Sequence, residues 1–308
     1  MATVIVTGGA GFIGSHVVDR LLPDGHDVHV VDDLSTGAKN NVDPRARLHV
    51  VDIRSADIGP LFARLKPAVV IHLAAQIDVR RSINEPALDA DVNIVGGLNV
   101  LAAAAAAGAR HFVFASSAAT YGPPPRLPLT EDLPLLPSSP YGIAKFAFEH
   151  YLRIYRPIRG LTSSVLRFAN VYGPRQTAKG EAGAVAIFLS RLLAGQDVRI
   201  NGDGGQTRDF VYVGDVARAV VLAAAGRFDG TCNVSTGVET SVNDLYARLR
   251  ALTGSTAEAA HGPAVPNEDR RCSLDPLRAF QELGWRPEIG LDEGLRRTYE
   301  AAASALKK

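Results

Sequence analysis

The stretch that decides the fold is residues 3–14, TVIVTGGAGFIG, an apolar β-branched run that leads into a glycine-rich segment. Its glycines Gly8, Gly11 and Gly14 are spaced three residues apart, between a predicted strand and a predicted helix. Glycines at such a turn let the backbone approach a pyrophosphate, and the first N–H groups of the helix point towards the anion. The same triplet also fits a tight turn with close helix packing, so the rest of the chain must distinguish the two interpretations.

Strand-like and helix-like segments alternate through the first half of the chain. Continuous apolar strands are typical of a parallel sheet that is covered on both faces. Strand–helix alternation with right-handed crossovers predicts an α/β fold with a doubly wound parallel Rossmann sheet. Gly108 suits the end of the third helix, and Pro157 prevents the fourth from continuing far. The predicted strands are 3–7, 27–31, 47–51, 69–73, 111–115 and 163–168, and the predicted helices are 11–22, 55–66, 88–107 and 141–155.

The regular alternation of strand-like and helix-like segments ends after about residue 172. Turn-rich segments such as NGDGGQTRD (201–209) then separate short helices and strands. We therefore expect a Rossmann domain at 1–172 and a smaller C-terminal α/β lobe that binds substrate at 173–308. Part of 210–236 is expected to return to the first domain, and Trp285 is expected to anchor the core of the second lobe.

The composition is that of an ordinary folded protein. The chain has 308 residues, 46% of them hydrophobic, and its 33 basic and 32 acidic side chains give a net charge of +1. A net charge this close to zero gives no excess of positive charge that would attract nucleic acid or an anionic membrane surface. Cys232 and Cys272 lack metal-site spacing and the eight histidines show no paired spacing, so we expect no metal. With no signal-peptide pattern and no stretch apolar enough to span a bilayer, we expect a cytoplasmic protein.

The end of the second predicted strand supports a dinucleotide. Asp32 follows Gly14 by eighteen residues, and a carboxylate there can accept hydrogen bonds from an adenosine ribose. Residues 33–35 (DLS) include no Arg or Lys to bind a 2′-phosphate, which favours NAD over NADP. Asp52 and Ile53 close the third strand, where they are placed to meet the adenine.

A second cluster predicts proton-transfer chemistry. Tyr141 and Lys145 form a Tyr-x-x-x-Lys pair at the start of a predicted helix, so both lie on one side of it. Ser117 lies 24 residues before Tyr141, at the end of the fifth predicted strand. A phenol titrates near ~10, and a neighbouring ammonium and an oxidised nicotinamide are expected to lower that pKa. Tyr141 could then exchange a hydroxyl proton during hydride transfer, while Ser117 holds the same hydroxyl.

These motifs together carry a family resemblance. TGGAGFIG, Tyr-x-x-x-Lys and SSAATYG (116–122) resemble an extended short-chain dehydrogenase/reductase. HLAAQIDVRRS (72–82), RFANVYGPRQ (167–176) and NGDGGQTRDFVYV (201–213) narrow the resemblance to nucleotide-sugar 4-epimerases of the UDP-glucose (UDP-galactose) 4-epimerase type. The similarity extends from the first strand to about Trp285.

The resemblance implies an NAD-dependent isomerase that inverts C4 of a UDP-sugar, most simply UDP-glucose and UDP-galactose, through a transient 4-keto sugar. It implies Ser117, Tyr141 and Lys145 as catalytic residues and a nucleotide-sugar-binding second lobe. The NAD-binding residues that follow are Gly8, Gly11, Phe12, Ile13, Gly14, Asp32, Asp33, Leu34, Ser35, Gly37, Asp52, Ile53, Leu73, Ala74, Ala75, Asn93, Ser116, Tyr141 and Lys145.

The second lobe supplies the implied substrate contacts. Asn170 and Arg208 match residues that bind the diphosphate, and a guanidinium suits that group. The family arginine ten residues before Asp275 is missing here, because that position is Val265, and Arg270 or Arg271 could replace the cation. The substrate residues that the resemblance implies are Ser117, Tyr141, Asn170, Ile200 and Asn201 (uridine), Arg208, Glu268 (ribose) and Cys272, which falls at the position that restricts the sugar.

Several alternatives stay open at this point. A small Cys272 is associated with admitting N-acetylhexosamines, although an inert core thiol fits as well. A UDP-GlcNAc 4-epimerase is therefore one alternative to the glucose/galactose enzyme. A UDP-glucuronate 4-epimerase is another, because cations are available for a C6 carboxylate, namely Arg80, Arg81, Lys179, Arg270 and Arg271. A dehydratase is disfavoured because residues 117–119 (SAA) include no carboxylate, and an NAD-sensing regulator is disfavoured because Ser117, Tyr141 and Lys145 are all present. The family also implies a homodimer through a four-helix seam formed by helices 98–107 and 141–155.

Overall fold

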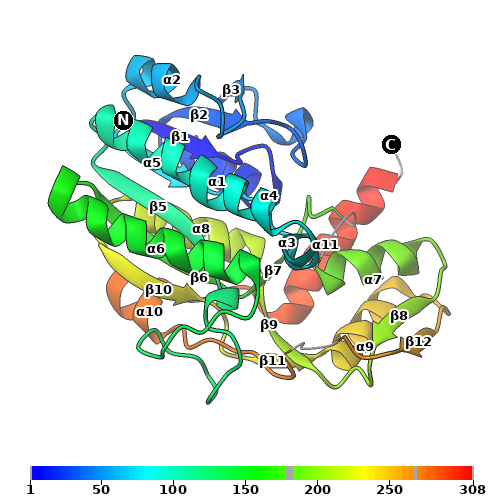
Figure 1. Ribbon diagram of the computed structural model, residues 1–308. Coiled ribbons are helices and arrows are strands. Elements are labelled where there is room, and N and C mark those ends of the chain that lie inside the picture. The colour runs from blue at the N-terminus through cyan, green and yellow to red at the C-terminus, as the bar shows by residue number, and fades with distance from the viewer. Residues whose placement is uncertain (1, 178–182, 266–268, 307–308) are drawn as a thin grey trace.

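The computed structural model describes residues 2–177, 183–265 and 269–306, and its centre is a parallel sheet (Figure 1). The order of the strands is β10-β6-β5-β4-β1-β2-β3, and every neighbouring pair is parallel. This confirms the doubly wound α/β fold. The strands are β1 (Thr3–Thr7), β2 (Asp27–Asp32), β3 (Arg47–Val50), β4 (Val69–His72), β5 (His111–Ser117), β6 (Thr162–Phe168) and β10 (Gly230–Val234).

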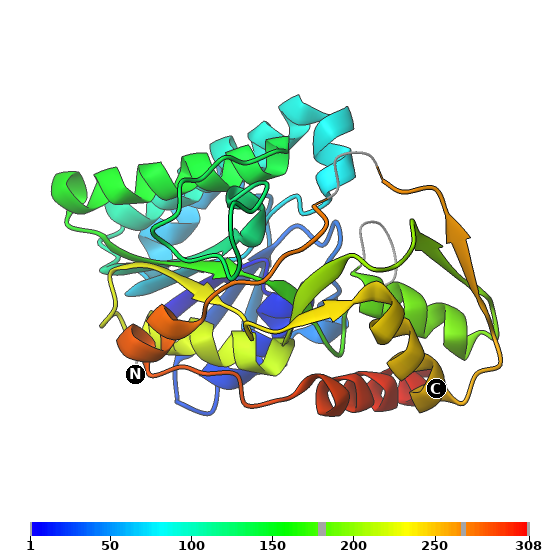
Figure 2. The same ribbon diagram turned by 90° about the horizontal axis from the view of Figure 1, so that it is seen from below.

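Helices cover both faces of the sheet, as Figure 2 shows with α6 on one side and α8 on the other. One face carries α2 (Ile58–Leu65), α5 (Gly97–Ala106) and α6 (Pro140–Arg159). The other carries α1 (Phe12–Leu21), α8 (Val213–Ala224) and α10 (Leu277–Leu283). The apolar side chains of each set meet the near-continuous apolar strands, which is why both sides of the sheet are buried.

Two helix predictions need correction in detail. The expected helix 88–107 is α4 (Pro86–Ala90), a π-helical turn η2 (Asp91–Gly96) and then α5, with α3 (Val79–Asn84) before them. Pro157 lies inside α6, which ends two residues later at Arg159, where Gly160 takes the left-handed conformation. Proline lacks a backbone N–H, and its ring clashes with the preceding helical turn, so both effects oppose further helix. The helix therefore extends for only two residues beyond Pro157.

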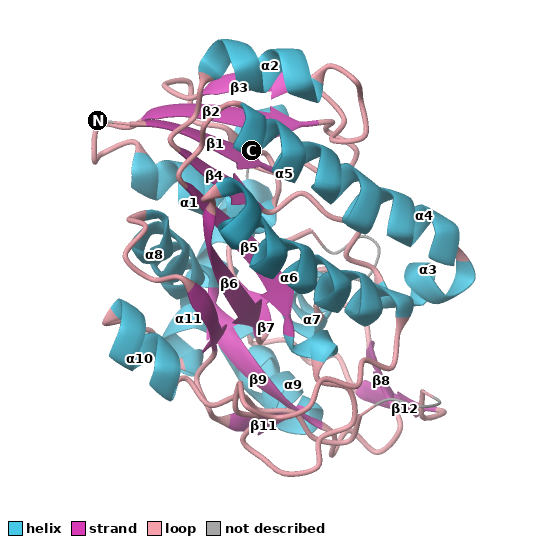
Figure 3. Cartoon of the chain, turned by 60° about the vertical axis from the view of Figure 1, so that its left-hand side comes forward, coloured by secondary structure: helices cyan, strands magenta, loops and turns pink. Residues whose placement is uncertain are grey.

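The remaining elements form the smaller lobe with α7, α9 and α11 (Figure 3). One small sheet has the order β11-β9-β7, and a second pairs β12 with β8. After β9 the chain passes through α8 into β10, which is the edge strand of the large sheet. The division into domains at residue 172 stays a prediction. The elements of this lobe are β7 (Asn170–Tyr172), α7 (Ala184–Leu193), β8 (Val198–Asn201), β9 (Thr207–Tyr212), β11 (Glu239–Ser241), α9 (Val242–Thr253), β12 (Ala259–Gly262) and α11 (Leu291–Leu306). Two 3-10 turns lie in the first half of the chain, η1 (Lys39–Asn41) between β2 and β3 and η3 (Ala118–Thr120) after β5.

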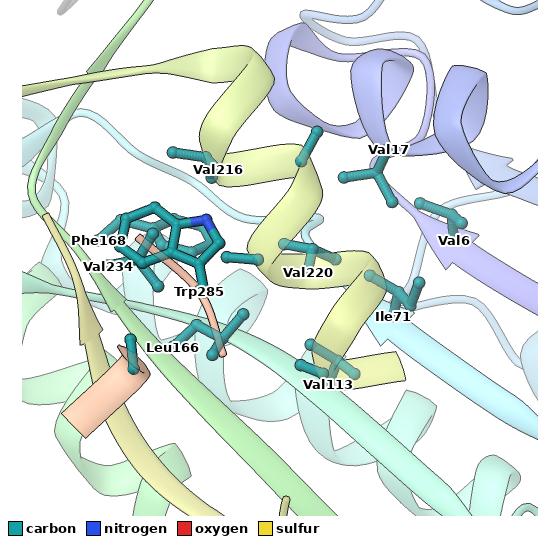
Figure 4. Close-up of a cluster of buried hydrophobic side chains, with 14 of the residues drawn as sticks. Val6, Val17, Ile71, Val113, Leu166, Phe168, Val216, Val220, Val234 and Trp285 are labelled. Atoms are coloured by element: carbon teal, nitrogen blue, oxygen red, sulfur yellow. The ribbon is translucent and has the colours of Figure 1, made fainter. Parts of the chain in front are cut away.

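Trp285 anchors a different core from the one expected. It is fully buried among residues of α8 and the large sheet, including Val216 and Val234 (Figure 4), and its indole N–H donates to the Asp215 carbonyl at 2.8 Å. The core of the second lobe is instead a separate cluster on α7, β8, β9 and α9. The expectation was wrong because the C-terminal segment returns to the large sheet before α11.

The segment Pro86–Ala106 is apolar and long enough to cross a membrane by length and composition alone. In the structure α5 packs on α2 and α6 and buries Val100 and Leu101 completely in the core that lies on the sheet. This helix is therefore a core helix.

Candidate active site

The glycine turn between β1 and α1 is closely packed. Gly8 has φ +71, and a Cβ there would lie 2.6 Å from the Ala74 backbone nitrogen at the end of β4. A Cβ on Gly14 would lie 2.1 Å from the Gly8 carbonyl oxygen, whereas one on Gly11 would lie 3.2 Å from it. The turn thus leaves the N-terminal N–H groups of α1 at the carboxyl ends of the strands, the arrangement that suits a pyrophosphate.

Asp32 ties the neighbouring loop to this turn. The Asp32 carboxylate accepts one backbone N–H from Ala10 and one from Leu34, each at 2.9 Å. Burial raises the pKa of Asp32, and the two hydrogen bonds oppose that shift. Each carboxylate oxygen keeps a further lone pair that a ribose hydroxyl could use. Next to it, Asp33 accepts hydrogen bonds from the backbone and hydroxyl of Ser35.

The other expected adenosine contacts lie around this edge. A Cβ on Gly37 would lie 2.9 Å from Asp32 Oδ1, so this loop passes close to the carboxylate. Asp52 is bound by the Arg54 guanidinium at 2.6 Å, and that ion pair lowers the pKa of Asp52. Ile53 is buried and its carbonyl accepts from the Asn99 amide. Phe12 and Ile13 form the first turn of α1 and pack against the core clusters.

The loop after β4 is held to the glycine turn. The Thr7 hydroxyl bonds His72 Nδ1 at 2.7 Å and accepts the Ala74 N–H at 3.3 Å. Farther along, the Asn93 side chain bonds both the backbone N–H and the carbonyl of Gln76, each at 2.9 Å. The expected cofactor residues Leu73, Ala74 and Ala75 therefore lie on a loop that the Asn93 side chain, from η2, holds through Gln76.

The first turn of α6 sets the positions of Tyr141 and Lys145. Ser139 caps the helix by accepting the Gly142 N–H at 3.1 Å, and Pro140 occupies the first helical position. Lys145 Nζ donates to the Ala115 carbonyl on β5 at 2.9 Å and lies 5.7 Å from the centre of the Tyr141 ring.

Ser117 completes this group of three side chains. It ends β5, two residues beyond the carbonyl that Lys145 contacts, and its side chain is hydrogen-bonded to Tyr141. The structure therefore brings together the three residues that the sequence predicted as catalytic.

Burial dominates the pKa values of Tyr141 and Lys145. Burial raises the pKa of Tyr141 to about 12, which outweighs the lowering by the Ser117 hydrogen bond, and the charge of Asp89 raises the pKa further. Burial lowers the pKa of Lys145 to about 8, against the opposing effect of Asp89. In the chain by itself desolvation therefore dominates, because it disfavours the charged forms of both groups. The expected fall of the phenol pKa, which also depends on the oxidised nicotinamide, stays a prediction.

Ser116, expected in the cofactor site, makes a different contact. Its hydroxyl donates to Glu149 at 2.6 Å, and Glu149 forms a buried ion pair with Arg167 at 2.7 Å. This network attaches the end of β5 to α6 and β6.

The expected substrate residues other than Ser117 and Tyr141 lie on β7 or after it in the chain. Asn170 begins β7 and is exposed, and Arg208 on β9 donates to the carbonyls of Thr207 and Asp269 at 2.8 and 2.9 Å. Ile200 is 1% exposed in the second core, so only its backbone can face a ligand. The Asn201 carbonyl accepts from Gln206. Glu268 lies outside the described residues.

The two arginines considered as replacements for the missing cation are already paired. Arg270 binds Asp203 at 2.7 Å, and Arg271 binds Glu239 at 2.5 Å. Cys272 is partly buried, and burial raises the pKa of its thiol to about 11, so it stays protonated and unreactive at neutral pH.

A cavity of about 840 Å³ lies between the loop after β5 and the segment before α10. Its lining residues are Pro123, Pro124, Pro125, Arg126, Leu127, Ser138, Asp269, Arg270 and Arg271. In the part of the chain that the structure describes, no group of three or more His, Cys, Asp or Glu is arranged to hold a metal ion. The absence of a metal stays a prediction.

Sequence reasoning missed Asp89 on α4. It is 1% exposed, its Oδ1 accepts hydrogen bonds from Gln76 at 2.8 Å and Asn93 at 2.9 Å, and its charge acts on both Tyr141 and Lys145. The available signal was an acidic residue four positions before Asn93 in a largely apolar helix, a spacing that places both on one face.

The doubly wound sheet, the glycine turn and the Ser117–Tyr141–Lys145 group define an extended short-chain dehydrogenase/reductase. Residues 4–234 match the model of the NAD dependent epimerase/dehydratase family. The chain belongs to this family, and NAD is its cofactor.

Full-length relatives and solved structures agree with this assignment. The chain is 46% identical to a UDP-glucose 4-epimerase of Mycolicibacterium smegmatis, over 96% of this chain and 97% of the relative. It is 45% identical to a putative UDP-glucose 4-epimerase of Methanocaldococcus jannaschii, over 96% of each. Its structure resembles that of the Thermotoga maritima UDP-glucose 4-epimerase with UDP-glucose, at a TM-score of 0.96, 43% identity and 99% coverage of both chains.

Proposed function

We propose that this enzyme is a UDP-glucose 4-epimerase that interconverts UDP-glucose and UDP-galactose with NAD as a resident cofactor. The observation that carries the proposal is the convergence of Tyr141, Ser117 and Lys145 at the carboxyl end of β5 in an NAD-dependent family. Relatives that carry this activity in their names match the chain over almost its full length.

In the proposed mechanism the bound NAD supplies a hydride acceptor and, later, a hydride donor. Tyr141 Oη removes the C4 hydroxyl proton while the C4 hydride departs, and it returns the proton when the 4-keto sugar is reduced from its other face. Ser117 hydrogen-bonds the same oxygen, and the Lys145 ammonium favours the phenolate. Burial holds the pKa of Tyr141 at about 12, so a positive charge brought by the oxidised nicotinamide must offset this desolvation.

The residues that would hold NAD fit it. The packed turn at Gly8, Gly11 and Gly14 leaves helix N–H groups for the pyrophosphate, and Asp32 keeps lone pairs for the adenosine ribose. Asn170 and Arg208 would hold the substrate diphosphate, and Glu268 would hold its ribose. While the diphosphate and its ribose are held, the sugar can rotate between the two hydride transfers and present its other face.

A UDP-GlcNAc 4-epimerase is a second candidate, because the small thiol Cys272 falls where the family restricts the sugar. The test is a panel of UDP-galactose, UDP-GlcNAc and UDP-glucuronate under identical conditions. We expect turnover of UDP-galactose, and its absence would overturn the assigned substrate.

The assigned base is tested by Tyr141→Phe. This variant should keep NAD bound and lose at least about 100-fold in the rate of interconversion, the range that general base catalysis contributes. NAD content of the purified protein and epimerase rate are the two measurements. Unchanged interconversion would remove Tyr141 from its role.

We also propose a cytoplasmic homodimer. The outward face of α6 exposes four large apolar side chains, Ile143, Tyr151, Ile154 and Ile158. A patch of this kind on a surface helix is typical of an interaction site, and a second copy of α6 with its neighbour α5 would cover it. Sedimentation should give a dimer, and Ile154→Glu with Ile158→Glu should give a monomer; a monomeric wild-type protein would contradict the seam.

A further inference from the structure

A buried carboxylate lies on α4, which packs against α6, the helix that carries Tyr141 and Lys145. Asp89 is 1% exposed, and its Oδ1 accepts two hydrogen bonds, from the Gln76 and Asn93 side-chain amides. Its second oxygen, Oδ2, is buried and has no hydrogen-bond partner among the described residues. A buried carboxylate that lacks half of its partners is costly, so it calls for a reason.

The local backbone is built to keep the carboxylate there. The π-helical turn η2 begins two residues after Asp89 and contains Asn93, whose side chain also bonds both backbone groups of Gln76. Gln76 Nε2 in turn bonds Asp89 Oδ1 and the Asp78 carbonyl. Single π-helical turns inside α-helices are frequent at functional sites. Here the turn connects Asp89 to the loop that follows β4.

Other charged groups around α4 already have partners of their own. On α3, Arg81 pairs with Glu85 at the surface, and Arg80 is also engaged. On η2, Asp91 pairs with Arg54, and on α6 Glu149 pairs with Arg167. His72 on β4 is buried and neutral, since burial lowers its pKa to about 3. The remaining titratable groups on α6 that face Asp89 are Tyr141 and Lys145, and the charge of Asp89 acts on both.

We propose that Asp89 is a positioning residue of the catalytic site: its buried carboxylate is a counter-ion that favours the ammonium form of Lys145 and, together with burial, the neutral form of Tyr141 until a cationic cofactor ring lies beside it. The inference rests on the proposed function, since it assigns Asp89 a role in the ionisation of the same two side chains. Asp89 acts through them and does not contact the sugar.

The sign of the effect follows from the charges. A negative charge near Lys145 raises the pKa of the ammonium, and near Tyr141 it raises the pKa of the phenol. Removing that charge therefore lowers both pKa values. In an enzyme that needs ionised Tyr141 and protonated Lys145, the acid and the alkaline limbs of the rate profile should both move to lower pH.

The test is Asp89→Asn in the NAD-bound enzyme, with Asp91→Asn as the matched control. An asparagine keeps an oxygen for Gln76 and Asn93 and removes only the charge. Asp91 is two residues farther along, half exposed and paired with Arg54, so its removal changes the same net charge at another place. We expect kcat/KM for UDP-galactose to shift on both limbs by about one pH unit to lower pH in Asp89→Asn, and to stay in place in Asp91→Asn.

A second measurement separates this inference from the proposed activity. The near-ultraviolet absorbance of the Tyr141 phenolate, taken as the difference between each protein and its Tyr141→Phe counterpart, titrates without turnover. Asp89→Asn should lower that midpoint, and an unchanged midpoint together with unshifted limbs would overturn the role of Asp89. A wild-type enzyme without epimerase activity whose midpoint still moves in Asp89→Asn would overturn the function and leave the counter-ion in place.

Discussion

Gly14 lies in the first turn of α1, close to the glycine turn, and Gly14→Ala should impair NAD binding more than Gly11→Ala does. The new Cβ would lie 2.1 Å from the Gly8 carbonyl oxygen and 2.8 Å from the Gly9 Cα, against an ordinary contact of 3.4 Å or more. The neighbouring atoms are backbone, so the turn must move by about 1 Å relative to the helix. That movement takes the helix N–H groups away from the pyrophosphate.

The cost can be estimated from the lost hydrogen bonds. Each hydrogen bond to a charged group contributes about 1.5–3 kcal/mol, so losing one or two costs about 3 kcal/mol, or about 100-fold in the Kd for NAD. Gly11→Ala should have a smaller effect, because its Cβ would lie 3.2 Å from the same oxygen. Gly59→Ala on α2 is the matched control, since a Cβ there meets nothing within 4 Å. It should leave the Kd unchanged and raise stability by about 0.5–1 kcal/mol.

The assay is NAD affinity by calorimetry after the bound cofactor has been removed, together with the NAD content of each purified variant. Circular dichroism and cooperative urea unfolding establish that each variant is folded. The reasoning is refuted if folded Gly14→Ala binds NAD within about threefold of the wild type, or if Gly59→Ala weakens binding as much as Gly14→Ala does.

Two further predictions concern stability. Glu149→Gln should lower the free energy of unfolding by about 3 kcal/mol, because Arg167 is 5% exposed and would keep an uncompensated charge. The double variant Glu149→Leu with Arg167→Leu removes both charges and should recover part of that loss in urea unfolding. If both variants lose the same free energy of unfolding, the uncompensated charge is not the cause. In the folded protein burial lowers the pKa of His72 to about 3, against an ordinary value of 6.5. As the pH falls between these two values, the unfolded chain binds a proton that the folded protein does not, so the free energy of unfolding falls. His72→Phe should reduce that slope by about 1.4 kcal/mol per pH unit in unfolding titrations, and an equal slope would exclude His72 as the cause.

The sequence by itself determined the features that depend on neighbours along the chain. The spacing of Gly8, Gly11 and Gly14, the apolar runs of the strands and the Tyr141–Lys145 interval are local, and each has a direct geometric meaning in a strand, turn or helix. They were enough to predict the parallel sheet and the group formed by Ser117, Tyr141 and Lys145, because the carboxyl ends of parallel strands meet at one edge.

Only the tertiary structure decided what is buried against what. It placed Trp285 under α8, buried Asp89 on α4 where its charge acts on Tyr141 and Lys145, gave Arg270 and Arg271 carboxylate partners and raised the pKa of Tyr141. These outcomes depend on which distant segments meet and on how much water they exclude. Desolvation and long-range charge pairing are properties of the packed chain, and no spacing along the sequence encodes them.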